Sequence, residues 1–255
     1  MGEESVDLRE VLRDARRVVV FTGAGVSAES GIPTFRDALT GLWHRFDAAE
    51  LATADAFRRD PALVWGWYEW RRMKVLAASP NDGHEAIAAM ERRVSKLTLI
   101  TQNVDDLHER AGSAAVIHLH GSLFAPRCFE CSRPAVFAEE RPEEPEGGRR
   151  IEPPECAHCG SPVRPGVVWF GESLPEGALE QAFEAARACD VLFSIGTSSL
   201  VHPAAEIPFA AAQAGAAVVQ VNPNSTPLDR LARFNLRGAA AQLMPRLVQE
   251  TWPGH

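Results

Sequence analysis

The chain has 255 residues, of which 45% are hydrophobic and 24% are charged, a composition typical of a globular protein with a sizeable core. Its net charge of −8, without a basic stripe, argues against nucleic-acid binding, and no apolar run is long enough to span a membrane. The acidic N-terminal residues contain no apolar signal segment. We therefore expect a cytoplasmic protein with reduced cysteines and no nucleic-acid or membrane partner.

The first expected element is an amphipathic helix over residues 6–15, followed by a buried, β-branched strand over 18–22. Gly23, Gly25 and Ala28 follow this strand in the pattern Gly-x-Gly-x-x-Ala, the alanine-ended form of the dinucleotide-binding fingerprint. Gly23 would permit a tight turn, Gly25 would let the backbone approach a pyrophosphate, and Ala28 would keep the next helix close to the sheet. The backbone N–H groups that this turn opens would form an anion site.

The residues after the fingerprint make it more specific, because two glycines alone occur in many tight turns. The segment 30–33, Ser-Gly-Ile-Pro, ends any long helix early, so an ordinary dinucleotide-binding crossover is not expected. Phe35 and Arg36 then place an aromatic ring and a fixed cation just beyond the expected phosphate site.

An aromatic-rich helical module is expected over residues 38–80, and most of its aromatic side chains would form core. Within it, Tyr68 and Arg71 are three positions apart, which on a helix puts both side chains on one face. A phenol and a guanidinium on one face can together hold a carboxylate. Taken alone, however, the two residues favour a solvated arginine beside a half-buried tyrosine.

A second buried strand, over residues 96–101, leads into three polar side chains: Gln102, Asn103 and Asp105. Ligands of open α/β sheets bind at the carboxyl ends of the strands, so these amides and this carboxylate are placed to bind a ribose or a carboxamide. The alternative for Asp105 is a helix cap.

A third strand is expected over residues 116–120, with His118 and His120 on the same face. An imidazole at this edge can accept a proton from a hydroxyl group. A single histidine at a strand end is more often structural, so the pattern alone leaves the role of His120 open.

The remaining pattern predicts strands over residues 166–170, 190–195 and 217–221, and helices over 175–189 and 203–215. The first of these strands offers an edge that could pair with a substrate peptide, the alternative being an ordinary buried strand. Its candidate substrate-binding residues are Val168, Trp169 and Phe170. The loops after the other two strands carry small polar residues that could bind phosphate or ribose, namely Gly196, Thr197, Ser198, Asn222 and Asn224.

Four of the five cysteines form two Cys-x-x-Cys knuckles, made by Cys128 with Cys131 and by Cys156 with Cys159. In a reduced compartment this pattern indicates a tetrahedral Zn²⁺ site, and four thiolates leave no open position, so the metal would be structural. A redox dithiol, or replacement of one cysteine by His158, is the weaker alternative. The segment between the knuckles is rich in Glu, Pro and Gly and is expected to be an exposed excursion.

These elements together predict an α/β fold with a Rossmann-like parallel sheet and helices on both faces. We expect one domain over residues 1–255, with a helical substrate-side module over 38–80 and an inserted zinc-binding module over 124–166. Five loops at strand ends should then meet in one polar cleft.

The chain closely resembles the sirtuin family of NAD-dependent protein deacylases. The likeness is carried by residues 23–37, by the Thr-Gln-Asn-x-Asp-x-Leu-His stretch at 101–108, by His-Gly-Ser at 120–122 and by the paired knuckles. It implies that NAD is a consumed co-substrate, that one structural Zn²⁺ is bound, and that acyl groups leave protein lysine as O-acyl-ADP-ribose while nicotinamide is released. The implied partners are acyl-lysine proteins or peptides, and we expect a monomer.

The resemblance also assigns roles to residues. His120 would be the catalytic base that takes a proton from a ribose hydroxyl. The implied NAD contacts are Gly23, Ala24, Gly25, Ala28, Phe35, Arg36, Gln102, Asn103, Asp105, His120, Gly196, Thr197, Ser198, Asn222, Asn224 and, through its backbone, Ala240.

Tyr-x-x-Arg at this place is similar to the class III branch of the family, which removes acidic acyl groups such as succinyl and malonyl. The branch implies that Tyr68 and Arg71 bind the acyl carboxylate and that Ala48 widens the acyl pocket. We therefore expect a desuccinylase that also acts as a deacetylase.

Three other functions are compatible with parts of the pattern. An NAD-dependent dehydrogenase would produce NADH, a mono-ADP-ribosyltransferase would raise the mass of its acceptor where a deacylase lowers it, and a zinc-stapled binding module would release no nicotinamide. The early break at Ile32 and Pro33 and the zinc module argue against the dehydrogenase.

Overall fold

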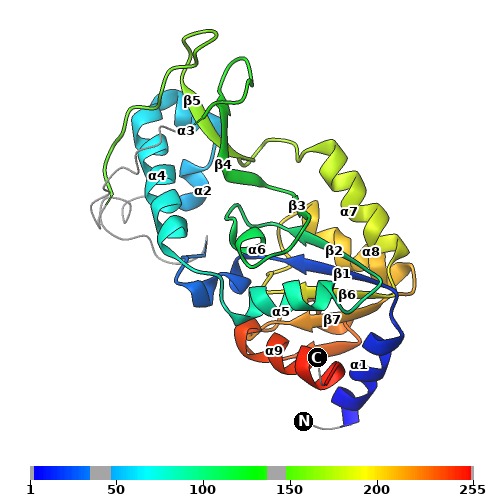
Figure 1. Ribbon diagram of the computed structural model, residues 1–255. Helices are drawn as coiled ribbons and strands as arrows, with labels where there is room; N and C mark the ends of the chain where they lie inside the picture. Colours follow the sequence, from blue (N-terminus) through cyan, green and yellow to red (C-terminus); the bar gives the residue numbers. More distant parts are fainter. Residues whose placement is uncertain (1–2, 35–46, 137–147, 254–255) are drawn as a thin grey trace.

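The computed structural model describes residues 3–34, 47–136 and 148–253. Its centre is a six-stranded, all-parallel sheet (Figure 1). From one edge to the other the strands are β3 (Val116–His118), β2 (Lys96–Thr101), β1 (Arg17–Thr22), β6 (Val191–Ile195), β7 (Ala217–Val221) and β8 (Phe234–Leu236). This order places β1 and β6 side by side at the point where the chain reverses its direction of travel across the sheet. The predicted Rossmann-like sheet is confirmed.

The two central strands are mostly apolar because both of their faces are covered. In β1, Val18 and Val20 belong to the core on one face of the sheet, whereas Val19 and Phe21 belong to the core on the other. This alternation is the period of two that a strand imposes on its side chains. Every residue of β6 is likewise buried.

Helices cover both faces, as predicted (Figure 1). The helices packed on one face are α1 (Glu3–Asp14), α5 (Asp82–Glu91) and α9 (Ala240–Thr251), and those on the other are α7 (Glu176–Ala188) and α8 (Ile207–Gln213). A short helix, α6 (Leu107–Arg110), follows β2. None of the helices among the described residues is both long and apolar enough to cross a membrane.

A smaller layer lies beyond the carboxyl ends of the central strands (Figure 1). It consists of α2 (Ala48–Leu51), α3 (Ala54–Arg59), α4 (Pro61–Ala77) and an antiparallel pair, β4 (Gly121–Cys128) with β5 (Val163–Val167). These helices and strands bury their apolar side chains in one shared core, in which Trp67, Phe57 and Trp169 are almost fully buried. The predicted helical module and the cysteine segment therefore pack directly on each other.

Three expectations about element bounds were wrong. The strand expected over 116–120 ends at His118, the strand expected over 166–170 is displaced to Val163–Val167, and the helix expected over 203–215 is a short 3₁₀ turn, Ala204–Glu206, followed by α8. Apolar residues continue past the ends of the first two of these elements, and periodicity alone does not show where strand pairing stops. The short strand β8 was not foreseen.

The segment after the fingerprint also differs from the expectation of a helix held against the sheet by Ala28. Two 3₁₀ turns, Ala24–Val26 and Ala28–Ser30, follow β1, and the second ends at Gly31, which has a positive φ of 79°. A left-handed residue followed by Ile32 and Pro33 stops the helical path, as the early break in the sequence indicated.

Candidate functional site

The loops at the carboxyl ends of β1, β2, β6 and β7 open into one cavity of ≈ 1360 Å³, bounded on its other side by α2, α4 and the segment after β5. Nineteen residues with a predicted site role line it: Gly23, Ala24, Gly25, Ala28, Tyr68, Arg71, Gln102, Asn103, Asp105, His120, Val168, Trp169, Phe170, Gly196, Thr197, Ser198, Asn222, Asn224 and Ala240. Ala48, expected to widen the acyl pocket, lines it as well. Phe35 and Arg36 lie outside the described residues.

The fingerprint glycines allow two loops to touch. Gly25 donates a backbone hydrogen bond of 2.8 Å to the carbonyl of Gly196, and Gly23 donates one of 3.0 Å to Ile195. A Cβ atom on Gly25 would lie 2.7 Å from both the Cα and the carbonyl oxygen of Gly196, closer than real Cβ contacts. The loops after β1 and β6 can therefore line one wall only if these positions have no side chain.

Ser27 connects the loop after β1 to the loop after β2, a role that the motif analysis missed. Its hydroxyl donates to Asp105 Oδ2 at 3.0 Å and accepts from Asn103 Nδ2 at 3.0 Å. Asp105 also accepts from the backbone N–H of Leu107, the first residue of α6, at 3.2 Å, and it lines the cavity, although the N-cap position of α6 is Asp106. The signal for Ser27 was its place inside the fingerprint, where a hydroxyl between two glycine turns is free to reach a neighbouring loop.

Burial raises the pKa of Asp105, and the hydrogen bonds from Leu107 and Ser27, with the charge of His118, oppose that rise. These donors favour the ionised form of the carboxyl group, whereas burial disfavours it.

A second network joins three strand-end loops at the far side of the cavity. Gln102 Nε2 donates to Thr197 Oγ1 at 3.0 Å, and Asn222 Nδ2 donates to the Thr197 carbonyl at 2.8 Å. Asn222 Oδ1 in turn accepts the backbone N–H of Asn224 at 3.0 Å. These amides therefore use part of their hydrogen-bonding capacity to hold the loops after β2, β6 and β7 together.

His120 is presented to the cavity in a defined tautomer. Its Nδ1 lies 3.0 Å from the carbonyl oxygen of Gln102, which can only accept a hydrogen bond, so Nδ1 carries the proton. Nε2 is then the basic nitrogen. Burial lowers the pKa of His120, and the bond to Gln102 offsets only part of this effect. The ring is consequently neutral at pH 7 and able to accept a proton.

Tyr68 lies on the opposite wall, where it is held by Trp169. The indole Nε1 of Trp169 donates to the Tyr68 hydroxyl oxygen at 3.1 Å, and the Arg164 guanidinium stacks on the Trp169 ring at 3.5 Å from its centroid. Glu172 accepts two hydrogen bonds from that guanidinium, of 2.5 and 2.9 Å. Burial raises the pKa of Tyr68, so the phenol stays protonated at any physiological pH.

Arg71 lies one helical turn from Tyr68 on α4, and both side chains reach the cavity, as the spacing predicted. Its guanidinium lies 5.3 Å from the centre of the Trp67 ring. The Arg71 side chain is buried, and this burial lowers its pKa. A buried cation has lost much of its hydration, so an anion that binds beside it stabilises it.

The segment after β5 is less open to peptide pairing than a free strand edge. The backbone N–H groups of Val168, Trp169 and Phe170 already donate to the His120 carbonyl at 2.8 Å, to Glu172 Oε2 at 2.9 Å and to the Ala52 carbonyl at 2.9 Å. Phe170 is nevertheless 52% exposed at the cavity wall. Any pairing with a peptide must therefore use the carbonyl groups of this segment or move it.

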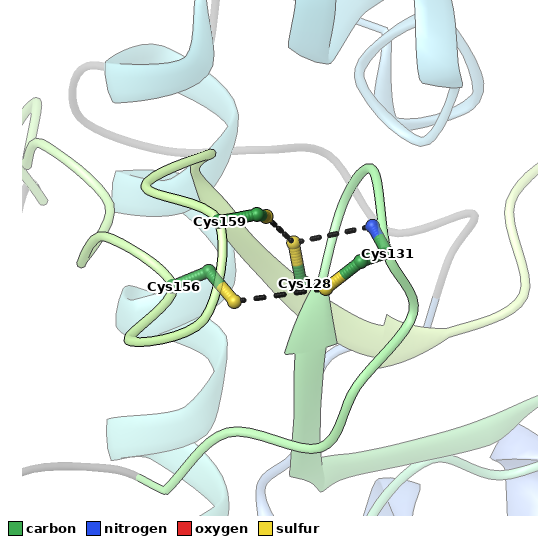
Figure 2. A group of neighbouring side chains, drawn as sticks. All are labelled: Cys128, Cys131, Cys156 and Cys159. Atoms are coloured by element: carbon green, nitrogen blue, oxygen red, sulfur yellow. Dashed lines mark hydrogen bonds between the residues drawn. The ribbon is translucent and has the colours of Figure 1, made fainter.

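The four knuckle cysteines converge on one point between β4 and the loop before β5 (Figure 2). Their sulfur atoms all lie within 4.8 Å of one another, with Cys128 and Cys159 3.4 Å apart and Cys131 and Cys156 3.7 Å apart. Four thiolates around a Zn²⁺ at about 2.3 Å produce sulfur separations of this size. The set fits one structural zinc ion and leaves no coordination position for catalysis. Cys189 is buried in the core beneath α7 and α8, away from this cluster.

Comparison with known proteins agrees with this arrangement. The description of the Sir2 family matches residues 23–203. The chain is 63% identical over 247 residues to an NAD-dependent protein deacylase of Methylococcus capsulatus, covering 97% of both chains. It is 60% identical over 247 residues to NAD-dependent protein deacylase 1 of Pseudomonas aeruginosa, covering 96% of this chain and 98% of that one.

Solved structures resemble the fold along nearly its whole length. A crystal structure of a Sir2 homolog–NAD complex superposes with a TM-score of 0.87 at 47% identity, covering 96% of this chain and 93% of the other. A Sir2–p53 peptide–NAD⁺ structure superposes with a TM-score of 0.81 at 30% identity, covering 96% and 97%. The family description covers residues 23–203 and these relatives cover nearly the whole chain, so the chain belongs to the Sir2, or sirtuin, family.

Proposed function

We propose that the chain is an NAD-dependent protein-lysine deacylase that removes succinyl and malonyl groups in preference to acetyl. One observation carries this proposal: Tyr68 and Arg71, a protonated phenol and a buried cation, line the same cavity as His120 and Asn103. A group bound beside the base would thus meet a pair of donors suited to a carboxylate. The partners would be proteins or peptides that carry acylated lysine.

NAD would enter as the co-substrate and supply the ribose that accepts the acyl group as nicotinamide leaves. The small-residue wall formed by the loops after β1 and β6 would hold the diphosphate, because its glycines allow the ligand to approach the backbone. Asn103 and Asp105, fixed by Ser27, would hold the nicotinamide side. His120 Nε2 would take a proton from a ribose hydroxyl, its ring oriented by the Gln102 carbonyl.

The acyl preference would come from the negative charge that succinyl and malonyl groups carry and that an acetyl group lacks. A succinyl or malonyl carboxylate would accept hydrogen bonds from the Tyr68 hydroxyl and the Arg71 guanidinium, and its negative charge would offset the burial of that cation. A charge-assisted hydrogen bond contributes about 1.5–3 kcal/mol net, which corresponds to roughly one to two decades in rate. An acetyl group offers nothing to these donors.

The zinc-binding module, residues 124–166, and the helical module, residues 38–80, would act as parts of one catalytic domain over 1–255. Their shared core supports this division, because it joins β4 and β5 to the helices that carry Tyr68 and Arg71. The zinc ion would hold the base of β4 and β5 and take no part in the chemistry.

Mass spectrometry of acetyl-, succinyl- and malonyl-lysine peptides incubated with NAD tests the proposal. We expect deacylation with nicotinamide release, faster for the acidic acyl groups, and none in His120→Ala. Arg71→Met should lower kcat/KM for desuccinylation about ten- to a hundredfold more than for deacetylation. Arg59→Met, an exposed arginine on α3, is the matched control and should change neither. Equal losses on both substrates in Arg71→Met would rule out the carboxylate pair.

A further inference from the structure

His118 is the last residue of β3 and lies against the loop that follows β2. Its Nδ1 is 3.1 Å from the backbone carbonyl oxygen of Asn103, and its Nε2 is 2.7 Å from Oε1 of Glu109 on α6. Burial acts to raise the pKa of Glu109, but the hydrogen bond from His118, a backbone hydrogen bond and the charge of His118 together outweigh burial and keep this pKa below its ordinary value, so Glu109 is ionised. A carbonyl and a carboxylate only accept hydrogen bonds. Both ring nitrogens of His118 therefore carry protons, and the ring is an imidazolium.

We propose that His118, held as an imidazolium between Glu109 and the Asn103 carbonyl, is a positioning residue for the 102–105 loop, and that its deprotonation sets the alkaline limit of NAD binding and turnover. This inference rests on the proposed function for its statement about turnover. Its statement about NAD binding stands on the loop geometry alone.

Several hydrogen bonds fix the 102–105 loop, which we propose contacts the nicotinamide side of NAD. The backbone N–H of Asn103 donates to Thr101 Oγ1 at 3.0 Å, and its side-chain Nδ2 donates to Ser27 Oγ at 3.0 Å. Its backbone carbonyl accepts a hydrogen bond from His118 Nδ1. The preceding backbone carbonyl, that of Gln102, accepts a hydrogen bond from Nδ1 of His120. Two histidines two positions apart thus hold two consecutive carbonyls. His120 does so as a neutral ring and His118 as a cation.

Loss of the His118 proton cannot leave this arrangement intact. A neutral ring with the proton on Nδ1 turns the Nε2 lone pair toward the Glu109 carboxylate, and the other tautomer turns the Nδ1 lone pair toward the Asn103 carbonyl. Either contact is repulsive and leaves a half-buried acceptor without its donor. The ring or the loop must then move, and the Asn103 amide moves with it.

The charges around His118 favour the cation. Burial acts to lower the pKa of His118, but the hydrogen bond and charge of Glu109, the Asn103 carbonyl and the charge of Asp105 outweigh burial and raise it. His108, on α6, is buried with a pKa lowered to about 3 and carries no competing charge at neutral pH. The loop is therefore held at pH values below the raised pKa of His118, and it is released as the pH rises through that pKa.

The test compares pH profiles in full-length variants. Glu109→Gln removes the stabilising carboxylate, so the alkaline fall in kcat/KM for NAD should move to lower pH. His118→Gln keeps an amide donor that does not titrate, so the alkaline fall should disappear from a profile with a lower maximum. Glu250→Gln, which removes the carboxylate of a remote ion pair with Arg9, is the matched control and should leave the profile unchanged. Coinciding profiles of the native chain and Glu109→Gln overturn the proposal.

Two readouts do not depend on catalysis. In NMR titrations of the free protein, the imidazole signal missing from His118→Gln should titrate above 6.5 in the native chain and lower in Glu109→Gln. NAD affinity measured by calorimetry should fall as this group loses its proton. An imidazole that titrates below 6.5, or an affinity that ignores this titration, overturns the inference. If NAD affinity follows the His118 titration but no acyl peptide is deacylated, the proposed function is overturned and the positioning role of His118 is retained.

Discussion

The indole Nε1 of Trp169 donates a hydrogen bond of 3.1 Å to the hydroxyl oxygen of Tyr68, a residue 101 positions earlier in the chain. Because Trp169 occupies an acceptor site on that oxygen, the hydroxyl proton of Tyr68 must point elsewhere. Both residues line the cavity, so the phenol is preset as a donor toward a bound acyl group. Arg164 and Glu172 hold the Trp169 ring in place from behind.

Trp169→Phe should therefore weaken recognition of acidic acyl groups. The ring is kept but the donor is lost, and a neutral hydrogen bond contributes about 1 kcal/mol, or roughly fivefold in rate. The ratio of kcat/KM for succinyl over acetyl peptides should fall by about that factor. In a double-mutant cycle, adding Trp169→Phe to Tyr68→Phe should bring little further loss in this ratio. Fully additive losses would show that Trp169 does not act through Tyr68.

Gly66 and Gly177 offer opposite outcomes for the same substitution. A Cβ atom on Gly66, inside α4, would lie 2.1 Å from the backbone carbonyl oxygen of Arg149, whereas one on Gly177, in α7, meets nothing within 4 Å. Gly66→Ala should lower the free energy of unfolding by about 1–3 kcal/mol through overpacking. Gly177→Ala should raise it by up to about 1 kcal/mol through helix propensity. Urea unfolding measures both, and a stabilised Gly66→Ala would contradict the contact.

His84 should make the protein less stable in acid. It accepts the backbone N–H of Asn81 in the capping box of α5, and its Nε2 lies 3.4 Å from Ser27 Oγ. Burial lowers its pKa to about 4, so the unfolded chain binds one more proton than the folded chain between that value and about 6.5. Through His84, the free energy of unfolding should fall by about 1.4 kcal/mol per pH unit as the pH drops across this window.

The measurement is the midpoint of chemical unfolding at several pH values. His84→Gln can still accept the Asn81 N–H, as glutamine does in a capping box, but it binds no proton, so its acid slope should be shallower by that amount. An unchanged slope in His84→Gln would mean that this imidazole does not stay neutral in the folded protein.

Removal of zinc should unfold the cysteine module first. Cys159→Ala leaves three thiolates on a cluster that holds the ends of β4 and β5, so metal analysis should show less than one zinc per chain. Because β4 and β5 share a core with α4, the melting temperature and the deacylation rate should both fall. Cys189→Ala, at a cysteine outside the cluster, should retain its zinc. Full zinc content in Cys159→Ala would contradict a four-thiolate site.

The predictable part of the fold followed local rules. Strands β1, β2, β6 and β7 were predicted because short, largely apolar runs rich in β-branched residues, such as that from Val18 to Thr22, are typical of strands buried on both faces of a sheet. The zinc set was found because two knuckles can close on one ion at little cost.

Sequence alone thus determined the four inner strands of the sheet, the metal ligands and the polar residues that the loops deliver to its edge, because each depends on periodicity or on short spacing. Only the tertiary structure decided what those residues do to one another. Ser27 fixes Asp105 across 78 positions, Trp169 presets Tyr68 across 101, and two neighbouring histidines acquire different charges because one faces a carboxylate and a carbonyl and the other a carbonyl alone. Proton positions are set by the partners that folding supplies, and no local pattern encodes which partners those will be.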